Sequence, residues 1–213
     1  MNFVFDFGRV LFEWQPERLL QRLLPQRASD PLSAAQWAGL VFQTDGGDWG
    51  EFDRGTVTPD ELVLRIARRT GLREDEVRAV VDAVPETLRP IPASVALMHR
   101  LRQPGQLMFF LSNMPAPYAD HLEREHAFVR EFDDGLFSAR VKLIKPEPAI
   151  FALAAQRFGV APSELVFLDD HPPNVTAARA AGWQALVFRD ALQCEQELRQ
   201  AGLWPPGADH PQV

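Results

Sequence analysis

Four short runs of apolar residues lie along the chain, and each is continuous rather than alternating with polar positions. They cover residues 3–5, 107–111, 165–168 and 185–188. Continuous runs rich in Phe, Val and Leu are typical of strands buried on both faces of a parallel sheet. The pattern therefore predicts a parallel sheet that is covered by helices on both sides.

The stretches between the later runs have apolar residues at helical spacing. Helices are predicted over residues 92–102, 147–158 and 173–181, and Gly159 and Gly182 follow the last two. Glycine is favoured directly after a helix because it adopts left-handed backbone conformations without strain. Strands that alternate with helices in this way predict an α/β fold, a doubly wound parallel sheet.

The long stretch between the first and second runs has no strand pattern and looks helical throughout. Its clearest helix start is the sequence TPDE, a capping box in which Thr58 and Glu61 bind each other's backbone. An insertion of this length suggests a separate subdomain that acts as a lid. The predicted organisation is a core of residues 1–13 and 88–204, a helical cap of residues 14–87, and a disordered tail of residues 205–213.

Composition and charge argue against several classes of protein. The chain has 213 residues, 46% of them hydrophobic, which is ample for a sizeable core. Its net charge of −7, with no block of Lys or Arg, argues against a nucleic-acid partner. No apolar run approaches the ~20 residues of a membrane span, and the early first strand leaves no room for a signal peptide. Cys194 is the only cysteine, so no internal disulfide forms, and we expect a cytoplasmic protein.

Acidic residues directly follow two of the predicted strands. Asp6 follows the first strand, and Asp169 and Asp170 follow the third. In a doubly wound sheet the carboxyl ends of the strands share one edge, where ligands bind. Carboxylates brought together there repel one another unless a cation lies between them, and hard oxygen ligands suit Mg²⁺. The other polar residues expected at this edge are Ser112, Asn113 and Lys145.

Four motifs along the chain resemble those of the haloacid dehalogenase-like hydrolases. They are, in order, DFGRVLF (6–12), LSN (111–113), KPEPAIF (145–151) and FLDDHPPNVTAARAAGW (167–183). The resemblance covers nearly the whole chain, and the helical insertion is similar to the C1-type cap of that family. It implies a Rossmann-like core and a Mg²⁺-dependent phosphatase that acts on a small phosphorylated metabolite.

The resemblance also assigns roles to the polar residues at the strand ends. Asp6 is the implied nucleophile, which forms an aspartyl-phosphate intermediate. Lys145 would neutralise charge and position Asp6. The implied phosphate-binding residues are Ser112, Asn113 and Lys145.

A magnesium site is implied at the same place. Asp6, the backbone carbonyl of Gly8, and Asp170 would hold the ion. Asp169 would reach it through water, because adjacent residues of an extended segment point to opposite sides.

Gly8 departs from the pattern of most phosphatases in this family, which carry a second aspartate there as the acid and base for the leaving group. The resemblance to members with glycine at this place implies a sugar-phosphate phosphatase, for example one that acts on glucose 1-phosphate. Two alternatives remain, a metal-free 2-haloacid dehalogenase and a non-catalytic binding protein. The adjacent acids Asp169 and Asp170 favour a metal and therefore favour the phosphatase.

Three further features have ordinary structural interpretations. We predict that His171 is an exposed loop histidine and that Asn174 caps the helix that follows it. The segment TDGGDWGEFDRG at 44–55 is predicted to be a flexible turn between two helices. If the cap selects the substrate, this segment and the loop that begins at Phe12 are the places to look.

Overall fold

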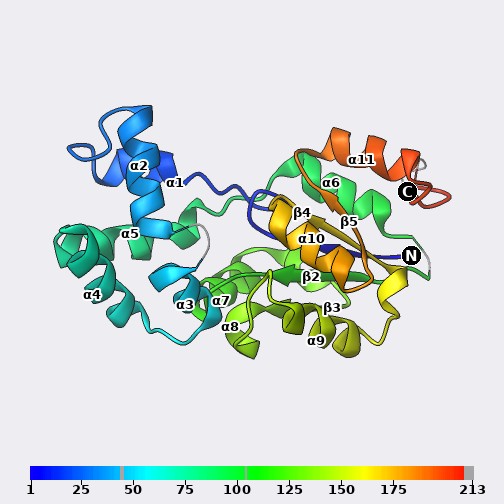
Figure 1. The fold of residues 1–213 in the computed structure, drawn as a ribbon. Coiled ribbons are helices and arrows are strands. Elements are labelled where there is room, and N and C mark those ends of the chain that lie inside the picture. Colours follow the sequence, from blue (N-terminus) through cyan, green and yellow to red (C-terminus); the bar gives the residue numbers. More distant parts are fainter. Residues whose placement is uncertain (44–45, 104, 209–213) are drawn as a thin grey trace.

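The computed structural model describes residues 1–43, 46–103 and 105–208 and has an α/β fold (Figure 1). Five parallel strands form one sheet in the order β3-β2-β1-β4-β5. This confirms the predicted doubly wound parallel sheet. The strands are β1 (Asn2–Phe5), β2 (Met108–Ser112), β3 (Asp134–Phe137), β4 (Leu165–Asp169) and β5 (Gln184–Val187).

Helices cover both faces of the sheet because successive strand side chains point to opposite sides. Phe3 and Phe5 pack in one hydrophobic cluster, and Val4, between them, packs in the other. Burial of one such side chain contributes about 1.5–3 kcal/mol. The first face is covered by α6 (Pro92–Leu101), α7 (Ala116–Glu125) and α11 (Ala191–Gln200), and the second by α9 (Pro148–Phe158) and α10 (Pro172–Ala180).

Five helices lie between β1 and α6 in the described chain. The second and fourth begin at capping boxes, those of Asp30 with Ser33 and of Thr58 with Glu61. Figure 1 shows α1, α2 and α4 on the side of the molecule away from the sheet. The five are α1 (Pro16–Leu23), α2 (Pro31–Phe42), α3 (Gly47–Arg54), α4 (Pro59–Thr70) and α5 (Glu74–Thr87).

The chain leaves and re-enters the core along two paired segments. The Glu13 N–H donates to the Arg89 carbonyl over 2.8 Å, and the Ile91 N–H donates to the Leu11 carbonyl over 2.8 Å. The five-helix insertion is therefore tied to the core beside the carboxyl end of β1.

The predicted turn at 44–55 is corrected by the structure. Residues 44–45 lie outside the described part, but Gly47–Arg54 form helix α3. Trp49 and Phe52 of this helix are buried and contact the rings of Phe42 and Tyr118 at centroid distances of 4.6 and 5.5 Å. Tertiary burial thus overrides the low helix propensity of glycine.

Other local differences concern short or polar elements. The sequence pattern did not predict β3, because Asp134 and Gly135 interrupt its apolar character. The predicted disordered tail also differs over 205–208, which form a turn with Ala208 buried, while 209–213 lie outside the described residues. The remaining short elements are α8 (Ser138–Val141), η1 (Ala127–Glu131) and η2 (Pro162–Glu164). No helix in the described part of the chain has both the length and the apolar character needed to cross a membrane.

Candidate active site

Three carboxylates meet at the carboxyl edge of the sheet. Asp6 directly follows β1, Asp169 is the last residue of β4, and Asp170 comes next. One oxygen from each lies within 4.8 Å of the others. The strand order makes this possible because β1 and β4 are hydrogen-bonded neighbours, so their carboxyl ends lie side by side.

Lys145 supplies the buried positive charge of this cluster. Its Nζ lies 2.8 Å from Asp6 Oδ1 and 2.6 Å from Asp169 Oδ2, and its side chain is 1% exposed. Burial alone would lower the pKa of Lys145, but Asp169 and Asp6 outweigh it and raise that pKa. The lysine is therefore a charged ammonium group that links two of the three acids.

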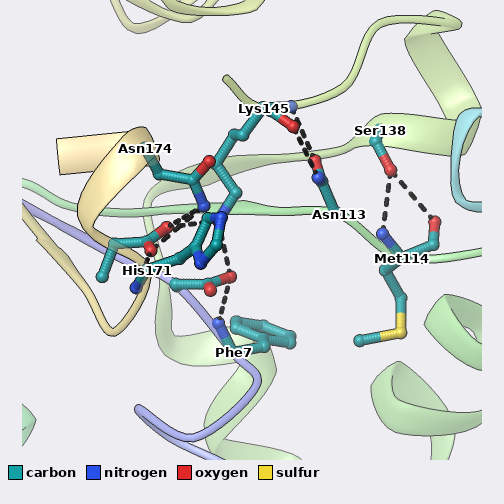
Figure 2. Close-up of polar contacts among 9 residues, drawn as sticks. Phe7, Asn113, Met114, Ser138, Lys145, His171 and Asn174 are labelled. Atoms are coloured by element: carbon teal, nitrogen blue, oxygen red, sulfur yellow. Dashed lines mark hydrogen bonds and ion pairs between the residues drawn. The ribbon is translucent and has the colours of Figure 1, made fainter. Parts of the chain in front are cut away.

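Asn113 holds the backbone of Lys145. The Asn113 Nδ2 donates to the Lys145 carbonyl over 2.9 Å, and the Lys145 N–H donates to Asn113 Oδ1 over 2.8 Å (Figure 2). Both polar ends of the amide are thus engaged by the lysine's main chain. The hydrogen bonds of Asn113 therefore position Lys145, and its contact with phosphate stays a prediction. Ser112, beside it, is buried and lines the cavity.

Asp169 is fixed by several donors. It is fully buried and accepts the His171 N–H over 2.8 Å. The Asn174 Nδ2 lies 3.1 and 3.0 Å from its two oxygens. The helix-cap role predicted for Asn174 is therefore replaced by an interaction inside the site, since α10 begins two residues earlier at Pro172.

Negative charge is costly at this edge. Burial raises the pKa of Asp6 to about 7, while Lys145 acts in the opposite direction. Burial, followed by the charge of Asp169, also raises the pKa of Asp170. Among the described ion pairs, Asp170 has one with Arg9, whose Nη1 lies 4.0 Å from Asp170 Oδ2. A cluster with more carboxylates than buried cations fits a hard divalent ion.

A cavity of about 770 Å³ lies between this edge and the five-helix insertion. Gly8 lines its floor, and a Cβ there would meet no other atom within 4 Å. An aromatic wall stands on the insertion side, where Phe42 contacts Trp14 and Trp49 edge to face at 5.0 and 4.6 Å. The cavity thus joins a charged floor to a largely apolar wall.

Two lining residues were not expected from the sequence in this role. His171, predicted to be exposed, is half-buried at the start of α10 and lines the cavity. Asp53, from α3, lines it from the insertion side. The sequence pointed to segment 44–55 as a place of substrate selection, but no signal singled out Asp53 within it, because the helix that carries it is held by contacts with residues far along the chain.

Comparison with known proteins places these features among relatives. A family model described as haloacid dehalogenase-like hydrolase matches residues 17–182, a range that begins after Asp6. The sesquiterpene phosphatase astK of Aspergillus oryzae is 27% identical over 92% of this chain and 94% of its own length. Drimenol cyclase drtB of Aspergillus calidoustus is 26% identical over 92% of this chain but only 35% of its own length. Hexitol phosphatase A of Escherichia coli is 33% identical over 48% of this chain and 47% of its own.

Solved structures share the fold. An enzyme of the same family from Bacteroides thetaiotaomicron, bt-2542, in complex with magnesium and inorganic phosphate, superimposes with a TM-score of 0.67 at 23% identity. That match covers 87% of this chain and 92% of the other. The L-2-haloacid dehalogenase of Xanthobacter autotrophicus gives a TM-score of 0.64 at 19% identity, over 98% and 85% of the two chains. At these identities the likeness extends to the fold alone.

Proposed function

Since this chain belongs to the haloacid dehalogenase-like hydrolase family, we propose that it is a Mg²⁺-dependent phosphatase acting through an aspartyl-phosphate on Asp6. The substrate is a small phosphorylated metabolite. The observation that carries the proposal is the meeting of Asp6, Asp169 and Asp170 within 4.8 Å, with Asp6 and Asp170 lining a cavity. The phosphatases among the relatives support it.

The residues at the cavity floor fit the implied metal. Asp6, the carbonyl of Gly8, and Asp170 would hold Mg²⁺. Asp169 would reach it through water, because its oxygens already accept hydrogen bonds from Lys145, His171 and Asn174. When bound, the ion would neutralise charge on the phosphate oxygens.

The protein's own groups prepare the nucleophile. Asp6 Oδ1 accepts the Phe7 N–H over 2.7 Å and is 2.8 Å from Lys145 Nζ. These contacts fix one carboxylate oxygen and leave Oδ2 as the oxygen that attacks phosphorus. Lys145 and Ser112 would hold the phosphate oxygens in line with it.

The walls of the cavity bear on the choice of substrate. Glycine at position 8 pointed to sugar phosphates, whereas Trp14, Phe42 and Trp49 offer an apolar surface to the organic group. We propose a phosphate monoester with an apolar body, a choice also supported by the phosphatase astK, named for sesquiterpenes. We expect a higher kcat/KM for an isoprenyl monophosphate than for glucose 1-phosphate. The reverse order would favour a sugar phosphate as the substrate instead.

The reaction itself is tested with 4-nitrophenyl phosphate. Hydrolysis should require Mg²⁺, stop in EDTA, and be abolished by Asp6→Asn. The matched control is Asp82→Asn, which changes a carboxylate that is 63% exposed on α5 and should keep full activity. Hydrolysis that persists without divalent metal would remove the metal from the proposal. Release of chloride from 2-chloropropionate would instead establish the dehalogenase.

A further inference from the structure

Gly8 has no side chain that could protonate the leaving group of a phosphate ester. A Cβ at this position would meet no other atom within 4 Å, so no neighbouring side chain fills that space. General acid catalysis typically contributes ~10²–10⁴-fold to a rate. A carboxyl group placed elsewhere in the cavity would supply it.

Asp53 is an acidic residue that lines the cavity and whose carboxyl group has no hydrogen-bond or ion-pair partner among the described residues. It lies in the last turn of α3 and lines the cavity together with Asp6 and Lys145. Glu51 and Glu147, which also line the cavity, are both bound by neighbouring side chains.

The surroundings of Asp53 keep it protonated. Burial raises the pKa of this carboxyl to about 8, and the charge of Asp6 raises it further than the opposing effect of Lys145 lowers it. The titratable group that faces it from α7 is Tyr118, whose hydroxyl donates to the Val81 carbonyl over 2.7 Å. At neutral pH the Asp53 side chain is therefore a neutral acid that holds a proton to give.

The core fixes the backbone of Asp53 through Ser138. The Ser138 Oγ accepts the Met114 N–H over 2.8 Å and donates to the Asp53 carbonyl over 2.5 Å. Figure 2 shows this hydroxyl next to Met114, which lies two residues after the end of β2. One side chain thus connects the strand that ends at Ser112 with the helix that carries Asp53.

The residues after Asp53 add two more attachments. Arg54 forms a bidentate pair with Glu147, with nitrogen–oxygen distances of 2.9 and 2.5 Å. Lys142 Nζ donates to the Gly55 carbonyl. Gly55 has φ 74°, and a Cβ there would lie 2.7 Å from the Ala139 carbonyl, so only glycine permits this close approach. These contacts hold the end of α3, and with it the backbone of Asp53, beside the cavity that Asp53 lines.

We propose that Asp53 is the general acid and base of the phosphatase reaction, in the role that Gly8 cannot fill. The proposal rests on the phosphatase function. In the first step Asp6 Oδ2 bonds to phosphorus, the bond from phosphorus to the ester oxygen breaks, and Asp53 gives its proton to that oxygen. In the second step Asp53 takes a proton from water as the water oxygen bonds to phosphorus. The aspartyl–phosphorus bond then breaks and phosphate leaves.

The experiment separates the two steps by the quality of the leaving group. Wild type and Asp53→Asn are compared in Mg²⁺ by stopped flow with 2,4-dinitrophenyl phosphate, a good leaving group, and with phenyl phosphate, a poor one. For the good leaving group, the variant should keep a burst equal to the active-site concentration, followed by turnover slower by ~10²–10⁴-fold. For the poor one, the first step itself should fall by ~10²–10⁴-fold and no burst should appear.

Controls keep each outcome decisive. Asp48→Asn changes an aspartate of the same helix that pairs with Arg69 at 2.8 Å, and it should behave as wild type. Gly8→Asp added to Asp53→Asn should restore hydrolysis of phenyl phosphate. If Asp53→Asn loses its helical circular dichroism, Asp53→Ser takes its place. Equal slowing of both substrates in the first step, or wild-type rates with both, overturns the role of Asp53. A wild type inactive on every phosphate ester overturns the phosphatase itself.

Discussion

Replacement of Lys145 by methionine would remove the buried cation of the acid cluster, and it tests whether that cluster needs one. Methionine keeps the length and most of the volume of the side chain. Asp6 and Asp169 would then face each other without the ammonium group that now lies 2.8 and 2.6 Å from them. We expect a large loss of stability in metal-free buffer.

The magnitude follows from two opposing terms. At an effective dielectric constant of about 20, each pair at this separation contributes about 6 kcal/mol of attraction. Removal of the ammonium group also abolishes its desolvation cost, which is several kcal/mol. The net loss when one partner of a buried pair is removed is about 3–5 kcal/mol. For a chain of this size that corresponds to a fall in Tm of about 6–20 °C.

Urea denaturation in EDTA, followed by tryptophan fluorescence, measures this loss. EDTA keeps a divalent ion from replacing the missing charge. The control is Lys142→Met, which changes the chain's other lysine, an exposed one, and should cost less than about 1 kcal/mol.

A double variant, Lys145→Met with Asp169→Asn, gives the sharper comparison. It removes both members of a pair, so it should be more stable than the sum of the two single losses predicts. A loss below about 1 kcal/mol for Lys145→Met, or strictly additive losses in the double variant, would refute the view that this lysine balances buried acids.

Three other substitutions or reagents test the packing and charge of the fold. Gly135→Ala would place a Cβ 2.2 Å from the ring of Phe110, so the free energy of unfolding should fall by about 1–3 kcal/mol. An unchanged midpoint of urea denaturation would contradict this close contact. Cys194 is fully buried, and burial raises the pKa of its thiol to about 12. Ellman's reagent at pH 8 should therefore react with this thiol only after denaturation, and rapid labelling of the folded protein would count against that burial. The pKa of Asp53 is raised from 3.8 to about 8, so the folded state holds a proton that the unfolded state releases, and stability falls as pH rises across this window. Between pH 5 and 8 the unfolding free energy of Asp53→Asn should therefore rise relative to that of wild type, by on the order of 1–3 kcal/mol given the partial exposure of Asp53. A difference in unfolding free energy that stays constant with pH would show that the carboxyl is ionised throughout.

Local patterns in the sequence were sufficient for most of the fold. The apolar runs located β1, β2, β4 and β5, and helix starts such as the capping box of Thr58 were found where expected. They succeed because strand burial and helix capping depend on residues within a few positions of each other. Edge strand β3 was missed because Asp134 and Gly135 give it no apolar run.

The sequence by itself also indicated which chemistry to expect. Acids that directly follow parallel strands must share an edge, so the positions of Asp6, Asp169 and Asp170 along the chain were enough to expect them together. That inference needs only the order of strands and the direction of the chain.

The partners of each site residue were decided only by the tertiary structure. The amide of Asn113 holds the main chain of Lys145, 32 positions away along the chain. The hydroxyl of Ser138 holds the main chain of Asp53, 85 positions away, beside the cavity. Helix α3 forms from a glycine-rich segment because Trp49 and Phe52 are buried against other helices. Such contacts leave no periodic trace in the sequence, because they depend on where distant segments meet after folding.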